Sequence, residues 1–311
     1  MPEYKRALVT GGAGFIGGHL SHALVSEGLD VTVVDSLLMG KTENVPSEAR
    51  FVQGDVRDVD LMRRLTAEAD IVFHEAAVVA IRTSVQGFYE DAETNIMGVL
   101  SVLEACKESP VRKLLFASSM AVYGDLPPGE TMTEDYKTAP TAPYGISKLA
   151  GESYVLNVCR TLGIDSVVLR YFNTYGTRQT FTPYVGVITI FIRQLLKGEQ
   201  ITVFGDGEQT RDYVNVRDIV QANLLAMRGN VNGETFNVAS GVTRSVNEIA
   251  DMLIRRLAPE VRPRYAPAQP GEMLRSAPGI DKARRMLGYS PTSDLEKDIQ
   301  EVIDWCKATQ P

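Results

Sequence analysis

A tyrosine and a lysine one helical turn apart are the residues of this 311-residue chain best suited to proton transfer. Tyr144 and Lys148 stand at positions i and i+4 of a stretch that follows Pro143 with helical periodicity, so their side chains share one helix face. An ammonium close to a phenol favours the phenolate and lowers its pKa, and the tyrosine can then exchange a proton with a hydroxyl or a carbonyl. Because Tyr-x-x-x-Lys is common by chance on solvated helices, the pair needs support from its surroundings.

Two serines upstream give part of that support. Ser118 and Ser119 end an apolar run, about 25 residues before Tyr144. A serine hydroxyl at such a strand end can bridge a substrate oxygen and the tyrosine. Without the tyrosine, the two serines would be read as an ordinary turn after a strand.

A glycine-rich loop between Thr10 and Gly17 gives the rest. Gly12-x-Gly14-x-x-Gly17 fits the fingerprint of dinucleotide-binding loops, and Gly11 adds a further glycine before it. The glycines allow a tight turn and a close approach of backbone to a pyrophosphate, which the N–H groups of the following helix attract. The loop therefore predicts a dinucleotide site in preference to a glycine turn without a ligand.

Asp35 ends the second predicted strand, 18 residues after Gly17. A carboxylate at this place accepts a hydrogen bond from a ribose 2′-hydroxyl and repels a 2′-phosphate. It favours NAD over NADP, although Lys41 lies nearby and could soften the discrimination. The alternative reading is a solvated aspartate at a strand end.

Short apolar strands alternate with helices in the first half of the chain. Strands are expected at residues 7–10, 31–34, 71–73 and 113–117, and helices at 16–26, 94–108 and 144–162. Continuous apolar strands separated by helices indicate a parallel sheet covered on both faces, with ligands at the carboxyl ends of the strands. The sequence therefore predicts an α/β protein with a Rossmann-type, doubly wound parallel sheet.

The pattern changes after about residue 170. Helices are expected at 188–196, 217–227 and 295–307, and the proline-rich stretch 259–278 is expected to be irregular. We predict a dinucleotide-binding domain over residues 1–172, with a later return segment around 211–240. Residues 173–311 form a smaller C-terminal α/β substrate domain in this interpretation.

Composition excludes several classes of protein. Hydrophobic residues make up 44% and charged residues 23%, which is typical of globular domains. A net charge of −7 argues against a nucleic-acid or anionic-membrane partner, and no apolar run is long enough to span a membrane. The start of the chain lacks a secretory signal pattern, so we expect a cytoplasmic protein with reduced thiols at Cys106, Cys159 and Cys306. Neither the cysteines nor the three histidines have metal-ligand spacing, and no metal is expected.

Together these motifs resemble those of the extended short-chain dehydrogenases/reductases of the NAD-dependent epimerase/dehydratase family. The resemblance covers nearly the whole chain. Further motifs that carry it are Gly54-Asp55-Val56, His74-Glu75-Ala76-Ala77, Asn95, Val122-Tyr123-Gly124, Arg170-Tyr171-Phe172-Asn173, Gly205-Asp206-Gly207 and Arg211-Asp212-Tyr213. The resemblance implies NAD as cofactor and a nucleotide-sugar bound between the sheet and the smaller domain.

The resemblance also implies a role for each motif. Tyr144 is the implied base, Lys148 its activator and Ser119 the third catalytic residue. The implied cofactor-binding residues are Gly11, Gly14, Phe15, Ile16, Gly17, Asp35, Asp55, Val56, Ala76, Ala77, Asn95, Ser118, Tyr144, Lys148 and Tyr171. The implied substrate-binding residues are Ser119, Tyr144, Asn173, Val187, Phe204, Arg211, Glu272, Ser276 and Arg82. Arg211 suits a diphosphate, because a guanidinium binds phosphate oxygens in a fork geometry.

The residues after Ser119 bear on the reaction. Family members that remove water as 4,6-dehydratases carry carboxyl groups here, and nucleotide-glucuronate decarboxylases keep a glutamate. Met120 and Ala121 cannot transfer protons and resemble the small apolar pair of the 4-epimerases. The resemblance therefore implies NAD-dependent inversion at C4 of a UDP-hexose through a transient 4-keto intermediate, with NAD kept bound and regenerated in each cycle.

The segment from Gln269 to Ser276 resembles the stretch that closes over the nucleotide-sugar. Gln269 and Glu272 replace the usual arginine and aspartate, which puts the nucleotide contacts at this end in question. Ser276 is small, as in epimerases that accept N-acetyl sugars. Arg275 and Arg82 could equally serve the carboxylate of a glucuronate, and a role as ordinary loop residues is open for all three.

Three alternatives stay open at this point. The chain could be a UDP-glucuronate 4-epimerase, another nucleotide-sugar oxidoreductase, or a non-catalytic NAD-sensing protein, which would need the glycine loop but not Tyr144 and Lys148. The helices expected at 94–108 and 144–162 match those that pair two subunits as a four-helix bundle in the family. A homodimer is therefore the expected assembly.

Overall fold

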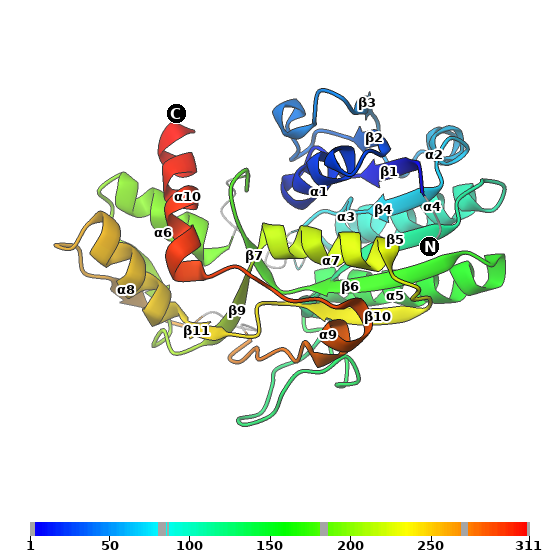
Figure 1. Ribbon diagram of the computed structural model, residues 1–311. Helices are drawn as coiled ribbons and strands as arrows, with labels where there is room; N and C mark the ends of the chain where they lie inside the picture. Colours follow the sequence, from blue (N-terminus) through cyan, green and yellow to red (C-terminus); the bar gives the residue numbers. More distant parts are fainter. Residues whose placement is uncertain (1–3, 80–84, 86, 181–185, 269–272, 310–311) are drawn as a thin grey trace.

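Seven parallel strands form the central sheet of the protein (Figure 1), in the order β10-β6-β5-β4-β1-β2-β3. The computed structural model describes residues 4–79, 85, 87–180, 186–268 and 273–309. The strands of the sheet are β1 (Arg6–Thr10), β2 (Asp30–Asp35), β3 (Arg50–Gln53), β4 (Ile71–His74), β5 (Lys113–Ser119), β6 (Asp165–Tyr171) and β10 (Glu234–Val238). The strand order reverses between β1 and β4, the place where such sheets open a crevice at their carboxyl ends.

Helices cover both faces of this sheet. On one face α1 (Phe15–Ser26) packs against α7 (Val216–Arg228), and α9 (Asp281–Leu287) lies beside α7 and β10. On the other face lie α2 (Val59–Thr66), α4 (Gly98–Cys106) and α5 (Pro143–Leu162). Neighbouring strand residues such as Leu8 and Val9 alternate between the two hydrophobic cores beneath these layers, as a pleated strand buried on both sides requires.

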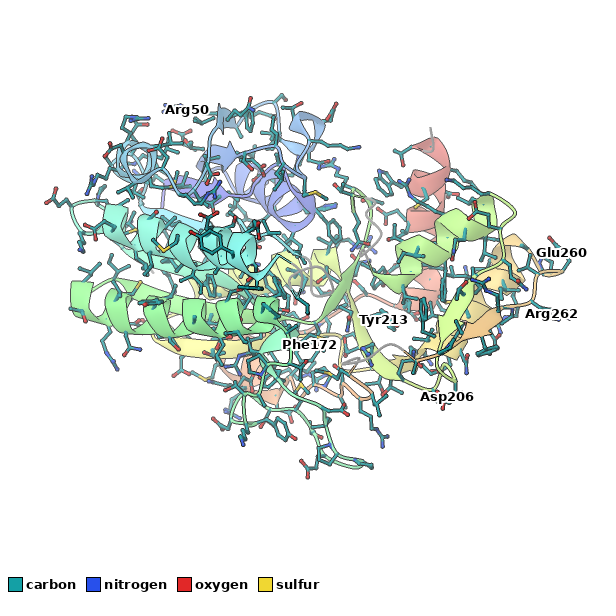
Figure 2. The ribbon with its side chains drawn as sticks, turned by 180° about the vertical axis from the view of Figure 1, so that it is seen from behind. Arg50, Phe172, Asp206, Tyr213, Glu260 and Arg262 are labelled. Carbon is teal, nitrogen blue, oxygen red and sulfur yellow. The ribbon has the colours of Figure 1, made fainter. Side chains whose placement is uncertain are left out.

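The C-terminal elements form a second group with a third hydrophobic core. Figure 1 shows them beside the central sheet, connected through β7 and β9. Their bounds are β7 (Asn173–Tyr175), α6 (Val187–Leu196), β8 (Thr202–Phe204), β9 (Thr210–Asn215), β11 (Thr243–Ser245), α8 (Val246–Leu257), β12 (Arg264–Ala266) and α10 (Leu295–Ala308). β11, β9 and β7 make a three-stranded sheet and β12 pairs with β8, while α6, α8 and α10 enclose the third core. In Figure 2, Phe172 and Tyr213 lie where this group meets the central sheet, and Asp206, Glu260 and Arg262 lie at its outer end.

The predicted α/β class and the doubly wound parallel sheet are confirmed. The expected helix over residues 94–108 is wrong at its start, because α3 (Phe88–Ala92) already precedes it and a π-helical turn, Glu93–Met97, links α3 to α4. A π turn adds a residue to the helical repeat and interrupts the 3.6-residue pattern from which helices are predicted. The division into residues 1–172 and 173–311 stays a prediction. No helix in the described ranges is long and apolar enough to cross a membrane.

Candidate active site

The glycine loop is a tight turn that cannot accept a side chain at Gly11 or at Gly17. Gly11 has φ +68°, and a Cβ added there would lie 2.7 Å from the backbone of Ala76. At Gly17 an added Cβ would lie 2.3 Å from the Gly11 carbonyl oxygen. The loop therefore lies directly against the end of β4 and against its own helix. These close approaches explain why the sequence places glycines at this spacing.

The N-terminus of α1 has the properties of an anion site. Gly14 is its N-cap, so no side chain caps the first turn, and no acidic residue lies in that turn. Phe15 and Ile16 open the helix, with their N–H groups at its positive end. A nucleotide pyrophosphate fits these donors.

Asp35 ends β2 next to this loop and is 8% exposed. Its carboxylate accepts hydrogen bonds from the backbone N–H of Ala13 (3.0 Å) and of Leu37 (2.8 Å). The aspartate therefore ties the glycine loop to the turn after β2, where the resemblance places the adenosine ribose. The alternative of a solvated aspartate does not agree with its burial.

Tyr144, Ser119 and Lys148 meet at the carboxyl end of β5. Tyr144 and Lys148 begin α5, which starts at Pro143 and ends at the left-handed Gly163. The hydroxyl groups of Tyr144 and Ser119 are hydrogen-bonded, and Lys148 Nζ donates to the Ala117 carbonyl oxygen at 2.9 Å. Lys148 Nζ is 5.9 Å from the centroid of the Tyr144 ring. The structure thus brings together the three residues singled out for proton transfer.

Electrostatics in this cluster depart from one expectation. Burial raises the pKa of Tyr144, the hydrogen bond with Ser119 opposes this, and the charges of Asp91 and Glu75 raise it further. The predicted lowering of the phenol's pKa by Lys148 is therefore wrong for the chain alone. Burial also acts on Lys148 and lowers its pKa to about 8, against the charges of neighbouring carboxylates.

Glu75 belongs to this cluster, and sequence analysis did not select it as a site residue. It follows β4 directly, and its Oε1 accepts a hydrogen bond of 2.9 Å from the hydroxyl of Tyr171. Burial raises the pKa of Glu75 to about 7. Its only sequence signal is a single carboxylate in an otherwise apolar stretch at a strand's carboxyl end.

Ser118 and Asn95 are engaged within the protein. The Ser118 hydroxyl donates to Glu152 Oε1 at 2.5 Å, and Glu152 forms a buried ion pair with Arg170 at 2.7 Å. Asn95 lies in the π-helical turn; its Oδ1 accepts from Val78 N at 2.9 Å and its Nδ2 donates to the Val78 carbonyl oxygen at 3.0 Å. Both side chains therefore support the site from behind, and direct contact with a cofactor stays a prediction.

The remaining predicted cofactor residues lie at strand ends near the loop. Val56 is buried against Gly98, whereas Asp55 is partly exposed and forms an ion pair of 2.7 Å with Arg57, which lowers its pKa. Ala76 and Ala77 follow Glu75, and Ala76 N donates to the hydroxyl of Thr10 at 3.3 Å. Tyr171 ends β6 beside Ser119 of β5.

Three of the predicted substrate residues, Asn173, Ser276 and Arg211, lie near Met120, the residue after Ser119, or near the segment that contacts it. Asn173 Nδ2 lies 3.3 Å from the sulfur of Met120, and the Ser276 hydroxyl lies 3.8 Å from that sulfur. Ser276 is fully buried, and its backbone N–H donates to the carbonyl oxygen of Thr210. Arg211 donates to the carbonyl oxygens of Thr210 and Met273, which places its guanidinium beside the same segment.

Four predicted residues are not joined to this group by the described contacts. Val187 begins α6 and packs against the C-terminal core, and Phe204 ends β8 and pairs with Ala266. Arg82 and Glu272, together with Gln269, lie outside the described residues.

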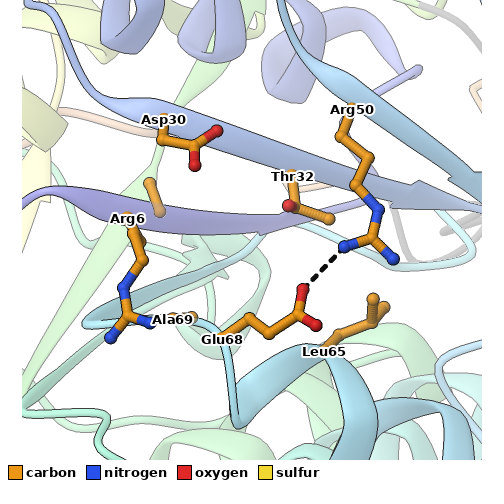
Figure 3. Close-up of a pocket in the computed structure, with 8 residues that line it drawn as sticks. Arg6, Asp30, Thr32, Arg50, Leu65, Glu68 and Ala69 are labelled. Atoms are coloured by element: carbon orange, nitrogen blue, oxygen red, sulfur yellow. Dashed lines mark hydrogen bonds and ion pairs between the residues drawn. The ribbon is translucent and has the colours of Figure 1, made fainter.

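A surface pocket of about 270 Å³ lies at the opposite edge of the sheet, away from these residues (Figure 3). It is lined by the amino ends of β1, β2 and β3, including Arg6, Asp30 and Arg50. Figure 3 shows the Arg50 and Glu68 side chains pointing toward each other, as an ion pair of 2.6 Å. Across the described ranges, no cluster of three His, Cys, Asp or Glu residues could hold a metal.

Comparison with known proteins agrees with this geometry. Residues 7–239 match the NAD dependent epimerase/dehydratase family. The chain belongs to this family. A UDP-glucose 4-epimerase of Mycolicibacterium smegmatis is 36% identical over 308 residues, which cover 96% of this chain and 98% of the relative. The predicted family and its NAD cofactor are therefore confirmed.

Two solved structures of this family are similar to the whole fold. One is UDP-glucose 4-epimerase with UDP-glucose from Thermotoga maritima, with a TM-score of 0.94 and 37% identity, covering 98% of this chain and 99% of that one. The other is UDP-N-acetylglucosamine 4-epimerase from Methanobrevibacter ruminantium in complex with UDP-N-acetylmuramic acid. Its TM-score is 0.93 at 32% identity, covering 99% of this chain and 100% of that one.

Proposed function

We propose that this chain is an NAD-dependent UDP-hexose 4-epimerase, which inverts C4 through a transient 4-keto intermediate. The observation that carries the proposal is the Tyr144–Ser119 hydrogen bond with Met120, and no carboxyl group, as the next residue. Tyr144 in its phenolate form, beside the Ser119 hydroxyl, can take one proton and give it back, which is all the acid–base chemistry that an epimerase needs. Elimination and decarboxylation need a further acid or base, which Met120 and Ala121 do not supply.

The chain's own groups fit NAD. The uncapped first turn of α1 suits the pyrophosphate, Asp35 lies beside the loop where the adenosine ribose is expected, and Lys148 can donate to the other ribose. Asp55, Val56, Ala76, Ala77, Asn95, Ser118 and Tyr171 complete the proposed cofactor site. The chemistry that NAD supplies when bound is acceptance and return of the hydrogen at C4.

Proton transfer falls to Tyr144. The step needs Tyr144 as the phenolate, against the burial that raises its pKa in the chain alone. The phenolate oxygen takes the proton of the C4 hydroxyl as the alcohol becomes a ketone, and the phenol so formed returns it after the ketone has turned over in the site. Ser119 shares a hydrogen bond with Tyr144 and can bridge it to the sugar oxygen. Tyr144 is only 5% exposed, and this burial keeps water away from its hydroxyl group.

The contacts around Met120 favour a neutral or N-acetylated sugar over a uronic acid. The sulfur of Met120 lies between Asn173 and Ser276 and offers no donor to a carboxylate. Arg275, the cation nearest to Ser276 in sequence, is exposed at the surface. The small, buried Ser276 is consistent with room for a 2-acetamido group. Asn173 and Arg211 are proposed to bind the UDP part.

A homodimer is proposed through the outer face of α3 and α5, which contact each other. Phe88 and Tyr89 on α3 are 64% and 66% exposed, and Ile146 and Tyr154 on α5 are 54% and 43% exposed. Exposed apolar side chains on two helices in contact are typical of a surface that a second subunit covers. Light scattering on the purified chain should give twice 34.1 kDa.

The reaction is tested with the purified protein and no added NAD. UDP-glucose, UDP-N-acetylglucosamine and UDP-glucuronate are incubated separately, and the C4 epimers are measured by chromatography. Conversion of a neutral or N-acetylated sugar supports the proposal, and conversion of UDP-glucuronate alone would make the uronic acid the substrate. Stoichiometric loss of added NADH would instead indicate a net reductase, and no conversion across the panel would overturn the proposed function.

A further inference from the structure

Glu75 occupies a position between the glycine loop and the proton-transfer residues. Its backbone N–H donates to the Thr10 carbonyl oxygen at 3.2 Å, and a Cβ added to Gly11 would lie 3.0 Å from its carbonyl carbon. The backbone of Glu75 is therefore held against the loop that the nucleotide approaches. Its side chain leaves this point toward β6 and α5.

The first partner of the side chain is Tyr171. Asn223 of α7 donates to the Tyr171 hydroxyl oxygen at 2.7 Å, and the hydroxyl donates to Glu75 Oε1 at 2.9 Å. Because the asparagine amide occupies the phenol oxygen as donor, the phenol hydrogen is directed at Glu75. The two hydrogen bonds therefore run in one direction, from Asn223 through the Tyr171 hydroxyl to the carboxyl oxygen of Glu75.

The second partner is the ammonium of Lys148. β4 and β5 pair His74 with Phe116, so the residues that follow, Glu75 and Ala117, stand at the same level of the sheet. The carbonyl oxygen of Ala117 accepts from Lys148 Nζ. Glu75 is also first among the carboxylates whose charge raises the pKa of Lys148, ahead of Asp91 and Glu152.

Most other titratable groups around Glu75 cannot supply a negative charge to Lys148. Burial and the charge of Lys148 lower the pKa of His74 to about 3, so it stays neutral. Glu152 is neutralised by Arg170, and burial raises the pKa values of Tyr144 and Tyr171. Asp91 of α3 remains as a second carboxylate, held by the amide of Asn95 at 3.0 Å.

We propose that Glu75 is a positioning residue of the active site. Its carboxylate keeps Lys148 in its ammonium form and holds the hydroxyl group of Tyr171 in place. The inference deepens the proposed function and rests on it for its catalytic consequence. A buried lysine that loses the charge of a neighbouring carboxylate gives up its proton more readily. Without Glu75, Lys148 is expected to lose its proton at a lower pH than in the wild type.

The test is Glu75→Gln, which has nearly the same size and keeps an oxygen that accepts from Tyr171. In the variant, Lys148 keeps the charge of Asp91 nearby and can also become neutral by losing its proton, so the variant is expected to fold. The alkaline limb of kcat against pH should move about one unit lower, with little change in KM. The fall in kcat at low pH that protonation of Glu75 causes in the wild type should be absent from the variant. A uniform loss of kcat with both limbs in place would overturn the inference.

A readout without sugar separates this inference from the proposed function. The affinity for NAD, measured by fluorescence titration of the NAD-free protein from pH 6 to about pH 9, should begin to fall at lower pH in the variant than in the wild type. If the affinity shifts but no UDP-sugar turns over, only the proposed function fails. If turnover occurs and neither profile shifts, only the role of Glu75 fails.

Glu68→Gln is the matched control. It makes the same chemical change at the amino edge of the sheet, where Glu68 pairs with Arg50 at the surface. Both pH profiles should coincide with those of the wild type. An equal shift in Glu68→Gln would show a general charge effect and would overturn the assignment to Glu75.

Discussion

Titratable residues at the two edges of the parallel sheet differ in burial. They are buried at the carboxyl edge and exposed at the amino edge. At the carboxyl edge, Tyr144 and Lys148 are 5% and 3% exposed, and burial shifts the pKa of both. At the amino edge, the side chains of Arg50 and Glu68 are 57% and 60% exposed and pair in water around an open pocket. A hollow with charged walls does not by itself mark an active site. Burial, which makes each protonation state depend on its neighbours, distinguishes the candidate active site.

The largest expected effect is at the carboxyl edge. Tyr144→Phe removes the hydroxyl bonded to Ser119 and should lower kcat by about 10²- to 10⁴-fold, the usual contribution of a positioned acid–base group. NAD should stay bound, because the glycine loop and Asp35 are untouched. Turnover and the NAD content of the purified protein are the two measurements. Activity close to that of the wild type would remove Tyr144 from the proposed mechanism.

The second prediction concerns the ion pair behind the site. Glu152→Gln leaves the buried guanidinium of Arg170 without its counter-charge and should cost about 3–5 kcal/mol of unfolding free energy. Denaturant unfolding measures the loss. The double variant Glu152→Leu with Arg170→Met removes both charges of the pair and should recover most of the stability. A smaller loss in the single variant than in the double would mean that an unpaired Arg170 charge is not what destabilises Glu152→Gln.

Asp35 gives an intermediate effect that changes specificity. Asp35→Ser removes the charge that opposes a 2′-phosphate, so the preference for NAD over NADP should fall about tenfold or more. Binding titrations with both cofactors measure the ratio. The backbone N–H groups of Ala13 and Leu37 lose their carboxylate acceptor, so a modest weakening of both affinities is expected. An unchanged ratio would mean that Lys41 or another group sets the preference.

Features that depend on residues close together in the sequence could be predicted from it. The glycine spacing, the apolar strands and the Tyr144–Lys148 turn each have a signature within a few residues, and the structure places them as expected. The start of the α3–α4 region was missed, because the π turn over Glu93–Met97 has no such periodic signal.

Contacts between distant residues could not be predicted in this way. The Ser118 hydroxyl looked available for a ligand, but its partner Glu152 is 34 residues away. Glu75 and Tyr171 are 96 residues apart, and only the order of β4, β5 and β6 brings them together. The raised pKa of Tyr144 likewise follows from burial, which the spacing of two residues on a helix does not reveal.

The smallest expected effect is at the amino edge. It tests most directly the contrast between buried residues at one edge of the sheet and exposed residues at the other. Arg50→Met removes the exposed partner of Glu68 and should change the unfolding free energy by less than about 1 kcal/mol, because water screens the pair and holding two exposed side chains together costs conformational entropy. Any small loss should shrink further in high salt, where exposed charges interact weakly. Turnover and its pH profile should match the wild type, since Arg50 lies across the sheet from Tyr144. A loss of stability as large as that of Glu152→Gln, or a change in the pH profile, would mean that burial does not separate the two edges.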